Sequence, residues 1–88
     1  MLKLLGSNIR SWREARNLTQ EEFAAKVGFS RSYITEIETG KRNISILNFL
    51  KIITSLDVDP KFINDLFVEL KKYMDEHNAT STSDQNHL

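Results

Sequence analysis

The apolar residues of this chain fall into short stretches with helical spacing, and residues that start or end helices separate one stretch from the next. Thr19 is followed three residues later by Glu22, the capping-box pattern in which each side chain satisfies a free backbone N–H at a helix start. Gly28 closes the same stretch, because glycine readily adopts the left-handed conformation that ends a helix. No segment alternates apolar and polar residues for long enough to form a strand. The pattern therefore predicts an all-α fold built from short helices.

Five helices follow from these boundaries, since each apolar stretch after the first is preceded by a residue that caps helices well. A proline fits the first position of a helix because its missing N–H would have no partner there. Together the helices account for nearly all of residues 2–75. Their predicted starts are Leu2, Thr19, Ser30, Ser45 and Asp59-Pro60.

The chain divides into a packed domain over residues 1–75 and a polar tail over residues 76–88. At 88 residues it has room for one compact domain and not for a second. The tail holds Ala79 and Leu88 as its only apolar residues, so it cannot bury enough surface to offset the entropy of ordering it. We therefore expect residues 76–88 to be disordered.

Several function classes lack the residues that they need. The chain has no cysteine, which excludes a disulfide framework, a zinc ribbon and a cysteine nucleophile. His77 and His87 both fall in the predicted tail, so no Ser/His/Asp arrangement can form inside the domain. The sequence shows no secretory leader and no apolar run of roughly 20 residues. We predict a soluble, cytoplasmic protein that is not an enzyme, binds no metal, cofactor or small molecule, and does not enter a membrane.

Positive charge gathers in the N-terminal half of a chain whose net charge is zero. Residues 1–44 carry 8 basic and 5 acidic side chains, a net charge of +3, and residues 45–88 carry 4 and 7, a net charge of −3. In the positive half, two short helices meet around Gly28, and the second has a polar outer face. This is the helix-turn-helix arrangement, whose second helix, the recognition helix, reads DNA. The sequence therefore indicates a nucleic-acid-binding face.

A family resemblance is carried by Leu18-Thr19-Gln20-Glu21-Glu22-Phe23-Ala24, Val27-Gly28, Ile34, Ile37-Glu38 and Gly40-Lys41. Together these positions resemble the phage-repressor (Cro/C1, XRE) type of helix-turn-helix domain, over about residues 5–66. The resemblance implies a compact domain that binds double-stranded DNA sequence-specifically. A narrower likeness, in Arg31-Ser32-Tyr33-Ile34 and Arg42-Asn43, is to the controller proteins of restriction-modification systems, which are small dimers of this fold.

Base contacts are predicted on the recognition helix, because in such a domain its first residues lie against base edges in the major groove. Arg31 presents a planar guanidinium that can donate two hydrogen bonds to guanine O6 and N7. One turn further on, a threonine methyl can contact thymine, and the Glu36 carboxylate can accept from cytosine N4. Glu36 has two alternatives, since it can also orient Arg31 or face solvent. The predicted base-contacting residues are Arg31, Ser32, Thr35 and Glu36.

A second set of residues is predicted to hold phosphates. Gln20 occupies a position that bonds a phosphate in the resembled family, next to the free backbone N–H groups of a helix start. Tyr33 allows two arrangements, with its hydroxyl toward a phosphate or its ring packed beneath the helix. The predicted phosphate-contacting residues are Gln20, Ser30, Tyr33, Lys41, Arg42 and Asn43.

The resemblance also implies an ion pair between the first and third helices. Arg13 and Glu38 match positions that pair in some members of the family. We expect this pair to hold the fold together rather than to touch DNA. Removing one partner would leave the other charge uncompensated, at a large cost if the pair is deeply buried.

The last helix has more apolar residues than one core-facing stripe needs. One line, formed by Phe62, Leu66, Leu70 and Tyr73, can cover the domain's own core. A neighbouring line would then face water in a monomer. A symmetric dimer would bury this second line. The same dimer would place its two recognition helices about 34 Å apart, in successive major grooves of DNA. The alternative is a long helix folded fully over its own core. The predicted dimer-interface residues are Ile63, Phe67, Leu70 and Met74.

Together these features predict a transcriptional regulator that binds a pseudo-palindromic operator in double-stranded DNA as a homodimer. The likeness to controller proteins extends this prediction to control of a restriction-modification operon. The alternative is an antitoxin or another protein-interaction module that uses the same fold to bind a protein partner through its C-terminal tail. Against that alternative, the tail lacks the apolar anchors that such segments need.

Overall fold

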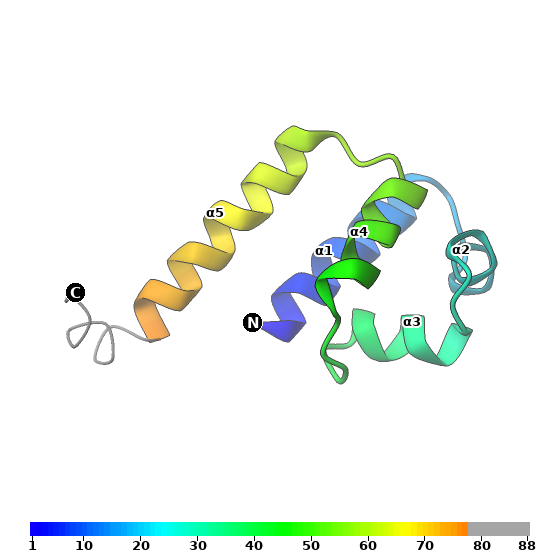
Figure 1. The fold of residues 1–88 in the computed structure, drawn as a ribbon, viewed down its shortest axis with the longest axis horizontal. Coiled ribbons are helices and arrows are strands. Elements are labelled where there is room, and N and C mark those ends of the chain that lie inside the picture. The colour runs from blue at the N-terminus through cyan, green and yellow to red at the C-terminus, as the bar shows by residue number, and fades with distance from the viewer. Residues whose placement is uncertain (78–88) are drawn as a thin grey trace.

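The computed structural model describes residues 1–77, which form five α-helices and no strand. Figure 1 shows α1 and α4 in the middle of the molecule, with α2 and α3 on one side and the longer α5 on the other. The prediction of an all-α, five-helix fold is therefore confirmed for this part of the chain. The helices are α1 (Leu2–Ala15), α2 (Gln20–Val27), α3 (Arg31–Glu38), α4 (Ile46–Ser55) and α5 (Pro60–His77).

Capping side chains set the helix boundaries close to where the sequence places them. Thr19 Oγ1 accepts a hydrogen bond from the backbone N–H of Glu22 (3.0 Å), and a Glu22 carboxylate oxygen accepts one from the N–H of Thr19 (2.8 Å). Ser30 and Ser45 cap α3 and α4, each accepting from the backbone N–H three residues further on. Gly28 follows α2 with φ of 84°, a left-handed conformation that costs glycine little. Local hydrogen bonds and one glycine thus fix where α2 ends and α3 begins.

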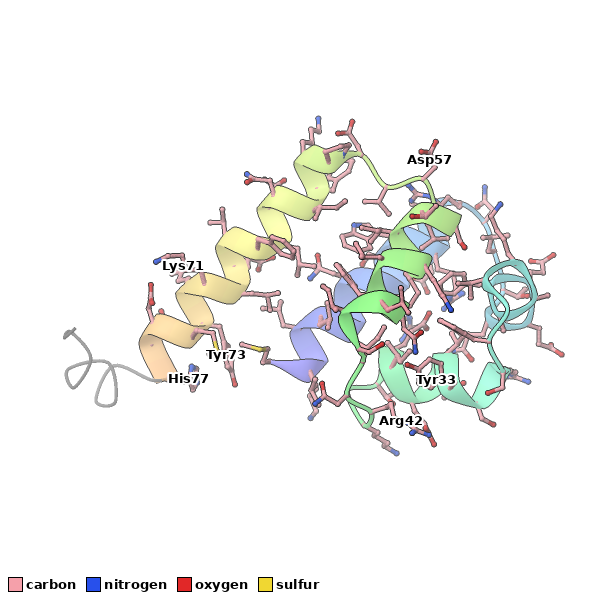
Figure 2. All side chains as sticks on the ribbon, viewed as in Figure 1. Tyr33, Arg42, Asp57, Lys71, Tyr73 and His77 are labelled. Carbon is pink, nitrogen blue, oxygen red and sulfur yellow. The ribbon has the colours of Figure 1, made fainter. Side chains whose placement is uncertain are left out.

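The end of α5 lies beyond the predicted domain boundary. Glu76 and His77, which the sequence analysis assigned to the tail, lie in the last turn of α5. The His77 ring stacks on Tyr73 at a centroid distance of 3.9 Å, and its Nδ1 lies 2.8 Å from the Tyr73 carbonyl oxygen (Figure 2). The rest of the predicted disordered segment, residues 78–88, lies outside the described residues.

The core surrounds α1, which packs against both α3 and α5. Ile34 and Ile37 project from the inner side of α3 into this core, so the orientation of the recognition helix is set by packing from beneath. Ala24 on α2 is buried as well, and its small side chain allows α2 and α3 to approach each other closely. The buried hydrophobic residues are Ile9, Trp12, Phe23, Ala24, Ile34, Ile37, Phe49, Ile52, Leu56, Val58 and Leu66.

α5 meets the core through a different line of residues from the one predicted. Leu66 is fully buried, and Ile63 and Leu70 pack beside it against the core. Phe62, which the sequence analysis placed over the core, is 45% exposed instead. At about 3.6 residues per turn, positions 63 and 70 lie on one side of position 66 around the helix and position 62 lies on the other side, and the core uses the side that carries Ile63 and Leu70. Ile63, predicted to face a partner, is therefore partly used by the core of its own chain.

Gly6 lets α1 approach the C-terminal end of α3. A β-carbon at this position would lie 2.2 Å from the backbone oxygen of Ile37 and 2.8 Å from that of Glu38. The clash is with backbone atoms, so the overpacking cost should reach the upper end of the usual range of about 1–3 kcal/mol. Alanine returns about 1 kcal/mol of helix propensity, and we therefore expect Gly6→Ala to lower the free energy of unfolding by about 2 kcal/mol.

Urea unfolding followed by circular dichroism measures this loss. Ser7→Ala is the matched control, because Ser7 is the exposed neighbour on the same helix and its replacement also improves helix propensity. Ser7→Ala should be neutral or slightly stabilising. An unfolding midpoint for Gly6→Ala equal to that of the wild type would mean that α1 and α3 are not in close contact.

Candidate nucleic-acid interface

The outward side of α3 carries the four residues predicted to contact bases. Ile34 and Ile37 on its inner side are buried, which leaves a polar strip facing solvent. This strip forms one wall of an open hollow of about 410 Å³ between α3 and the start of α2. The fold therefore brings the predicted base-contacting set to one surface. The residues around the hollow are Gln20, Arg31, Ser32, Thr35 and Glu36.

Arg31 is exposed on the first turn of α3. Its side chain makes no hydrogen bond or ion pair with any residue in the described part of the chain. Ser32, next to it, is also exposed. A permanently charged guanidinium without a protein partner is available to an anionic or electron-rich ligand on this side of the helix.

Gln20 is held at both ends of its side-chain amide. Nε2 donates a hydrogen bond to a Glu38 carboxylate oxygen (3.0 Å), and Oε1 accepts one from the Thr35 hydroxyl (3.0 Å). The Thr35 hydroxyl oxygen also lies 3.0 Å from the Arg31 carbonyl oxygen. An amide nitrogen carries two hydrogens, so one donor of Gln20 remains for an anion. The side chain is therefore a fixed link between α2 and α3 that can still donate one hydrogen bond outward.

Arg13 and Glu38 form a buried ion pair between α1 and α3. Nε and Nη2 of Arg13 donate to the two carboxylate oxygens at 2.7 and 3.1 Å. The pKa of Arg13 is raised above its usual value, chiefly by the hydrogen bond to Glu38, with a smaller opposing effect from burial. Nη1 of Arg13 donates to the Leu18 carbonyl oxygen (2.7 Å), which ties the turn before α2 to the same pair. The pair thus fixes α1, α3 and that turn relative to one another.

Tyr33 packs its ring inward and bonds its hydroxyl to α4. Its ring meets Phe29 edge to face at a centroid distance of 5.0 Å, and the ring is half-buried. Its hydroxyl oxygen accepts a hydrogen bond from Nδ2 of Asn48 on α4 (2.8 Å). Of the two arrangements considered from sequence, ring packing is the one observed, and the hydroxyl is bonded to protein. Its own hydrogen remains available as a donor.

Glu36 pairs with Arg42 and not with Arg31. Nε of Arg42 lies 2.9 Å from a carboxylate oxygen of Glu36. The alternative in which Glu36 orients Arg31 is therefore wrong. Arg31 and Glu36 are five residues apart on α3 and do not share a face of the helix, whereas the loop after α3 brings Arg42 within reach of the carboxylate. In that loop Lys41, Arg42 and Asn43 are all exposed.

Residues 9–63, from within α1 to the first turn of α5, match the sequence family described as Helix-turn-helix. This chain belongs to the helix-turn-helix family.

Its relatives include small regulators of restriction-modification systems. Control protein C.MunI from Mycoplasma sp. is 37% identical over 68 residues, which cover 76% of this chain and 88% of the relative. Among solved structures, the restriction-modification controller protein C.AhdI from Aeromonas hydrophila is 41% identical, with a TM-score of 0.65 over 69% of this chain and 92% of that chain. Controller protein C.Esp1396I, solved as a tetramer in complex with its natural 35 base-pair operator, is 33% identical, with a TM-score of 0.69 over 77% and 91% of the two chains.

The sequence-based assignment is confirmed at this level: the chain is a helix-turn-helix transcriptional regulator that resembles controller proteins. These relatives regulate transcription and are not enzymes, which confirms the prediction that the chain is not an enzyme.

The regulator also has an apolar groove that the sequence analysis identified only in part. It lies between α5, the start of α4 and α1, and has a volume of about 210 Å³. Phe67 and Leu70 belong to the predicted interface line, whereas the contribution of α4 was missed. The signal for it was Ile46, directly after the cap Ser45, because a position that is exposed in a monomer would ordinarily be polar. The groove is lined by Leu5, Ile44, Ile46, Phe49, Phe67 and Leu70.

Residues 1–77 hold no group of three or more His, Cys, Asp or Glu side chains that could bind a metal ion. None of the helices described is both long and apolar enough to span a bilayer.

Proposed function

We propose that this helix-turn-helix regulator binds a specific sequence in double-stranded DNA with α3 in the major groove. The observation that carries the proposal is Arg31, exposed on the first turn of α3 and unpaired within residues 1–77. An arginine in that position can donate two hydrogen bonds to guanine O6 and N7, a contact that discriminates by about 1–3 kcal/mol against other bases. Ser32 and Thr35 lie on the same strip and would contact neighbouring base edges.

Phosphate contacts would surround this strip. Lys41 and Asn43 are exposed in the loop after α3, and the Gln20 amide has a second hydrogen that neither of its two hydrogen bonds uses. Ser30, at the N-cap of α3, and the hydroxyl hydrogen of Tyr33 supply further donors at the same edge. Contacts of this kind fix the orientation of a protein on the duplex without selecting a sequence.

The regulator acts as a homodimer through the apolar groove between α4 and α5. Phe67 and Met74 on α5 are 51% and 44% exposed, and Ile46 on α4 is 69% exposed. Exposed apolar residues clustered around a groove are typical of interaction sites. A twofold-symmetric partner would bury them and present two α3 helices to successive major grooves of a pseudo-palindromic operator. Ile63 and Leu70 would support this surface from beneath.

Control of a restriction-modification operon in the cytoplasm is the specific role that we assign. The support is the likeness to C.MunI and C.AhdI, which covers 76% and 69% of this chain and 88% and 92% of those proteins. The C.Esp1396I relative was solved on a 35 base-pair operator, which is long enough for more than one dimer of this size.

The test separates base reading from phosphate binding. The duplex most enriched by the wild-type chain from a randomised library, and its single base-pair variants, serve as probes. Arg31→Ala should lose discrimination at one base pair by about 1–3 kcal/mol, because its bidentate partner is gone. Lys41→Ala should weaken binding to all duplexes alike and lower the salt slope by about one, because a phosphate contact carries no sequence information.

Fluorescence anisotropy across a salt series measures both quantities. Equal weakening of specific and random duplexes by Arg31→Ala would contradict its assignment as a base reader. A wild-type chain that enriches no sequence at low salt would contradict the proposed function as a whole.

A further inference from the structure

Arg42 is held in place from two directions on the outer side of α3. Its Nε lies 2.9 Å from Oε1 of Glu36, and its guanidinium carbon lies 5.4 Å from the centroid of the Tyr33 ring. We propose that Arg42 determines sequence specificity through Glu36: it fixes the carboxylate so that Oε2 accepts a hydrogen bond from the N4 amino group of a cytosine. This inference rests on the proposed function, since it requires α3 to lie in the major groove.

The aromatic ring beneath Arg42 is itself rigidly placed. Tyr33 packs edge to face on Phe29 and receives a hydrogen bond from Asn48, so elements on both sides of α3 fix its ring. A guanidinium stacks favourably on an aromatic face, and the contact reduces the number of conformations open to the long arginine side chain. Figure 2 shows Tyr33 and Arg42 next to each other at the outer edge of α3. The ion pair with Glu36 is therefore more ordered than an ordinary surface pair.

The ion pair with Arg42 allows a carboxylate, Glu36, to lie on a DNA-binding surface. An isolated Glu36 would be repelled by phosphates, whereas the guanidinium of Arg42 offsets its charge. Only Oε1 is engaged, and Oε2 has no hydrogen-bond partner among the described residues. A carboxylate oxygen is an acceptor only, so it selects a donor on the base edge. Cytosine N4 is the best match, because adenine presents its amino donor beside the N7 acceptor, which repels a carboxylate.

The chemistry of arginine suits this double task. Arg42 uses its single Nε–H on Glu36, and within residues 1–77 its two terminal nitrogens make no hydrogen bond. These nitrogens can hold a phosphate while Nε keeps the carboxylate in place. A lysine has one compact ammonium group and no planar fork, so it could not stack, pair and bind a phosphate in the same geometry. Arg42 is thus a positioning residue for the base contact of Glu36.

The experiment is a base-preference profile of the full chain. The probes are the duplex most enriched by the wild type from a randomised library and all its single base-pair variants. We expect Glu36→Ala to lose a preference for cytosine at one base pair, a change of about 10-fold or more in relative affinity. Arg42→Ala should lose the preference at that same base pair. The double variant should lose no more discrimination than either single variant, because the two residues act as one unit.

Two further variants separate geometry from charge. Arg42→Lys keeps the positive charge but not the planar fork, so it should retain the wild-type salt slope and still lose most of the cytosine preference. Lys41→Ala removes the neighbouring cation and should lower affinity for every probe by the same factor. The side chains of Arg42 and Glu36 are 54% and 42% exposed, so these variants should fold, and a circular-dichroism melt verifies that they do.

A uniform loss of affinity in Arg42→Ala, with the cytosine preference intact, would overturn the inference and leave Arg42 as a phosphate contact. A Glu36→Ala profile identical to that of the wild type would overturn it as well. Either result would leave the proposed function standing, provided that the wild type still enriches a sequence whose binding depends on Arg31. A wild type that enriches no sequence would overturn both proposals.

Discussion

Glu38→Ala is expected to lower the free energy of unfolding by about 3–5 kcal/mol, a large fraction of the total stability of a domain of this size. The Glu38 side chain is 1% exposed and that of Arg13 is 9% exposed. Without the carboxylate, the guanidinium of Arg13 stays buried without a counter-charge, and the Gln20 amide loses its acceptor. The three helices that meet at this pair would lose their shared contact.

Thermal and urea unfolding at a fixed protein concentration measure the effect, and the melting temperature should fall by more than about 10 °C. Asp75→Ala is the matched control, because it breaks an ion pair with Lys71 in which the side chains are 79% (Lys71) and 62% (Asp75) exposed. That pair should contribute no more than about 0.5 kcal/mol. Similar melting temperatures for Glu38→Ala and Asp75→Ala would contradict the burial of the Arg13 pair.

A double replacement distinguishes the cost of an unpaired charge from the value of the pair itself. Arg13→Met combined with Glu38→Leu fills the same space with apolar side chains. Such replacements of buried ion pairs are often neutral or stabilising, so the double variant should recover most of the stability lost by Glu38→Ala.

The helix starts and the helix-turn-helix could be predicted from the sequence because the signals for them are local. Thr19 and Glu22 satisfy each other's backbone groups within one turn, and Gly28 supplies the conformation that ends α2. Neither feature depends on the rest of the fold. The apolar spacing that buries Ile34 and Ile37 likewise leaves only one side of α3 to face outward. The location of the candidate interface therefore followed from short-range patterns.

The partners of the polar side chains could not be predicted in the same way. Whether Glu36 meets Arg31 or Arg42 depends on the path of the loop after α3, and that path is set by tertiary packing. The same holds for Gln20, whose amide is engaged by residues 15 and 18 positions away in sequence. Sequence patterns identify the donors and acceptors that a surface offers, but the packing angle between α2 and α3 decides which of them are already used.

The rotation of α5 about its own axis could not be predicted either, which is why the sequence analysis placed Phe62 over the core. Its apolar residues outnumber the positions of one stripe, so the sequence permits several rotations of the helix about its axis. The rotation observed buries Leu66 and places Phe62 and Phe67 on opposite sides of the buried line. Consequently Phe67 lies at the groove with α4, where it can meet a partner, and the groove could be located only once the rotation was known.

Phe67→Glu is expected to produce a folded monomer that binds a palindromic operator about 100-fold or more weakly than the wild type. Phe67 is 51% exposed, and its ring stacks on Phe49 at the mouth of the apolar groove. A charge at this position would have to be buried without a partner in a dimer, whereas in a monomer it remains in water. Losing the dimer removes the effective-concentration gain of about 10²–10⁴ that comes from linking two recognition helices.

Sedimentation velocity measures the oligomeric state, and anisotropy on two probes measures the consequence for DNA binding. On a duplex with a single half-site, Phe67→Glu and the wild type should bind alike, because α3 is untouched by the substitution. Val68→Glu is the matched control: Val68 is 59% exposed and does not line the groove. The two variants carry the same new charge at adjacent positions of α5. Because only position 67 lines the groove, Phe67→Glu should be a monomer and Val68→Glu should remain a dimer. A dimeric Phe67→Glu, or a monomeric Val68→Glu, would place the interface elsewhere on the molecule.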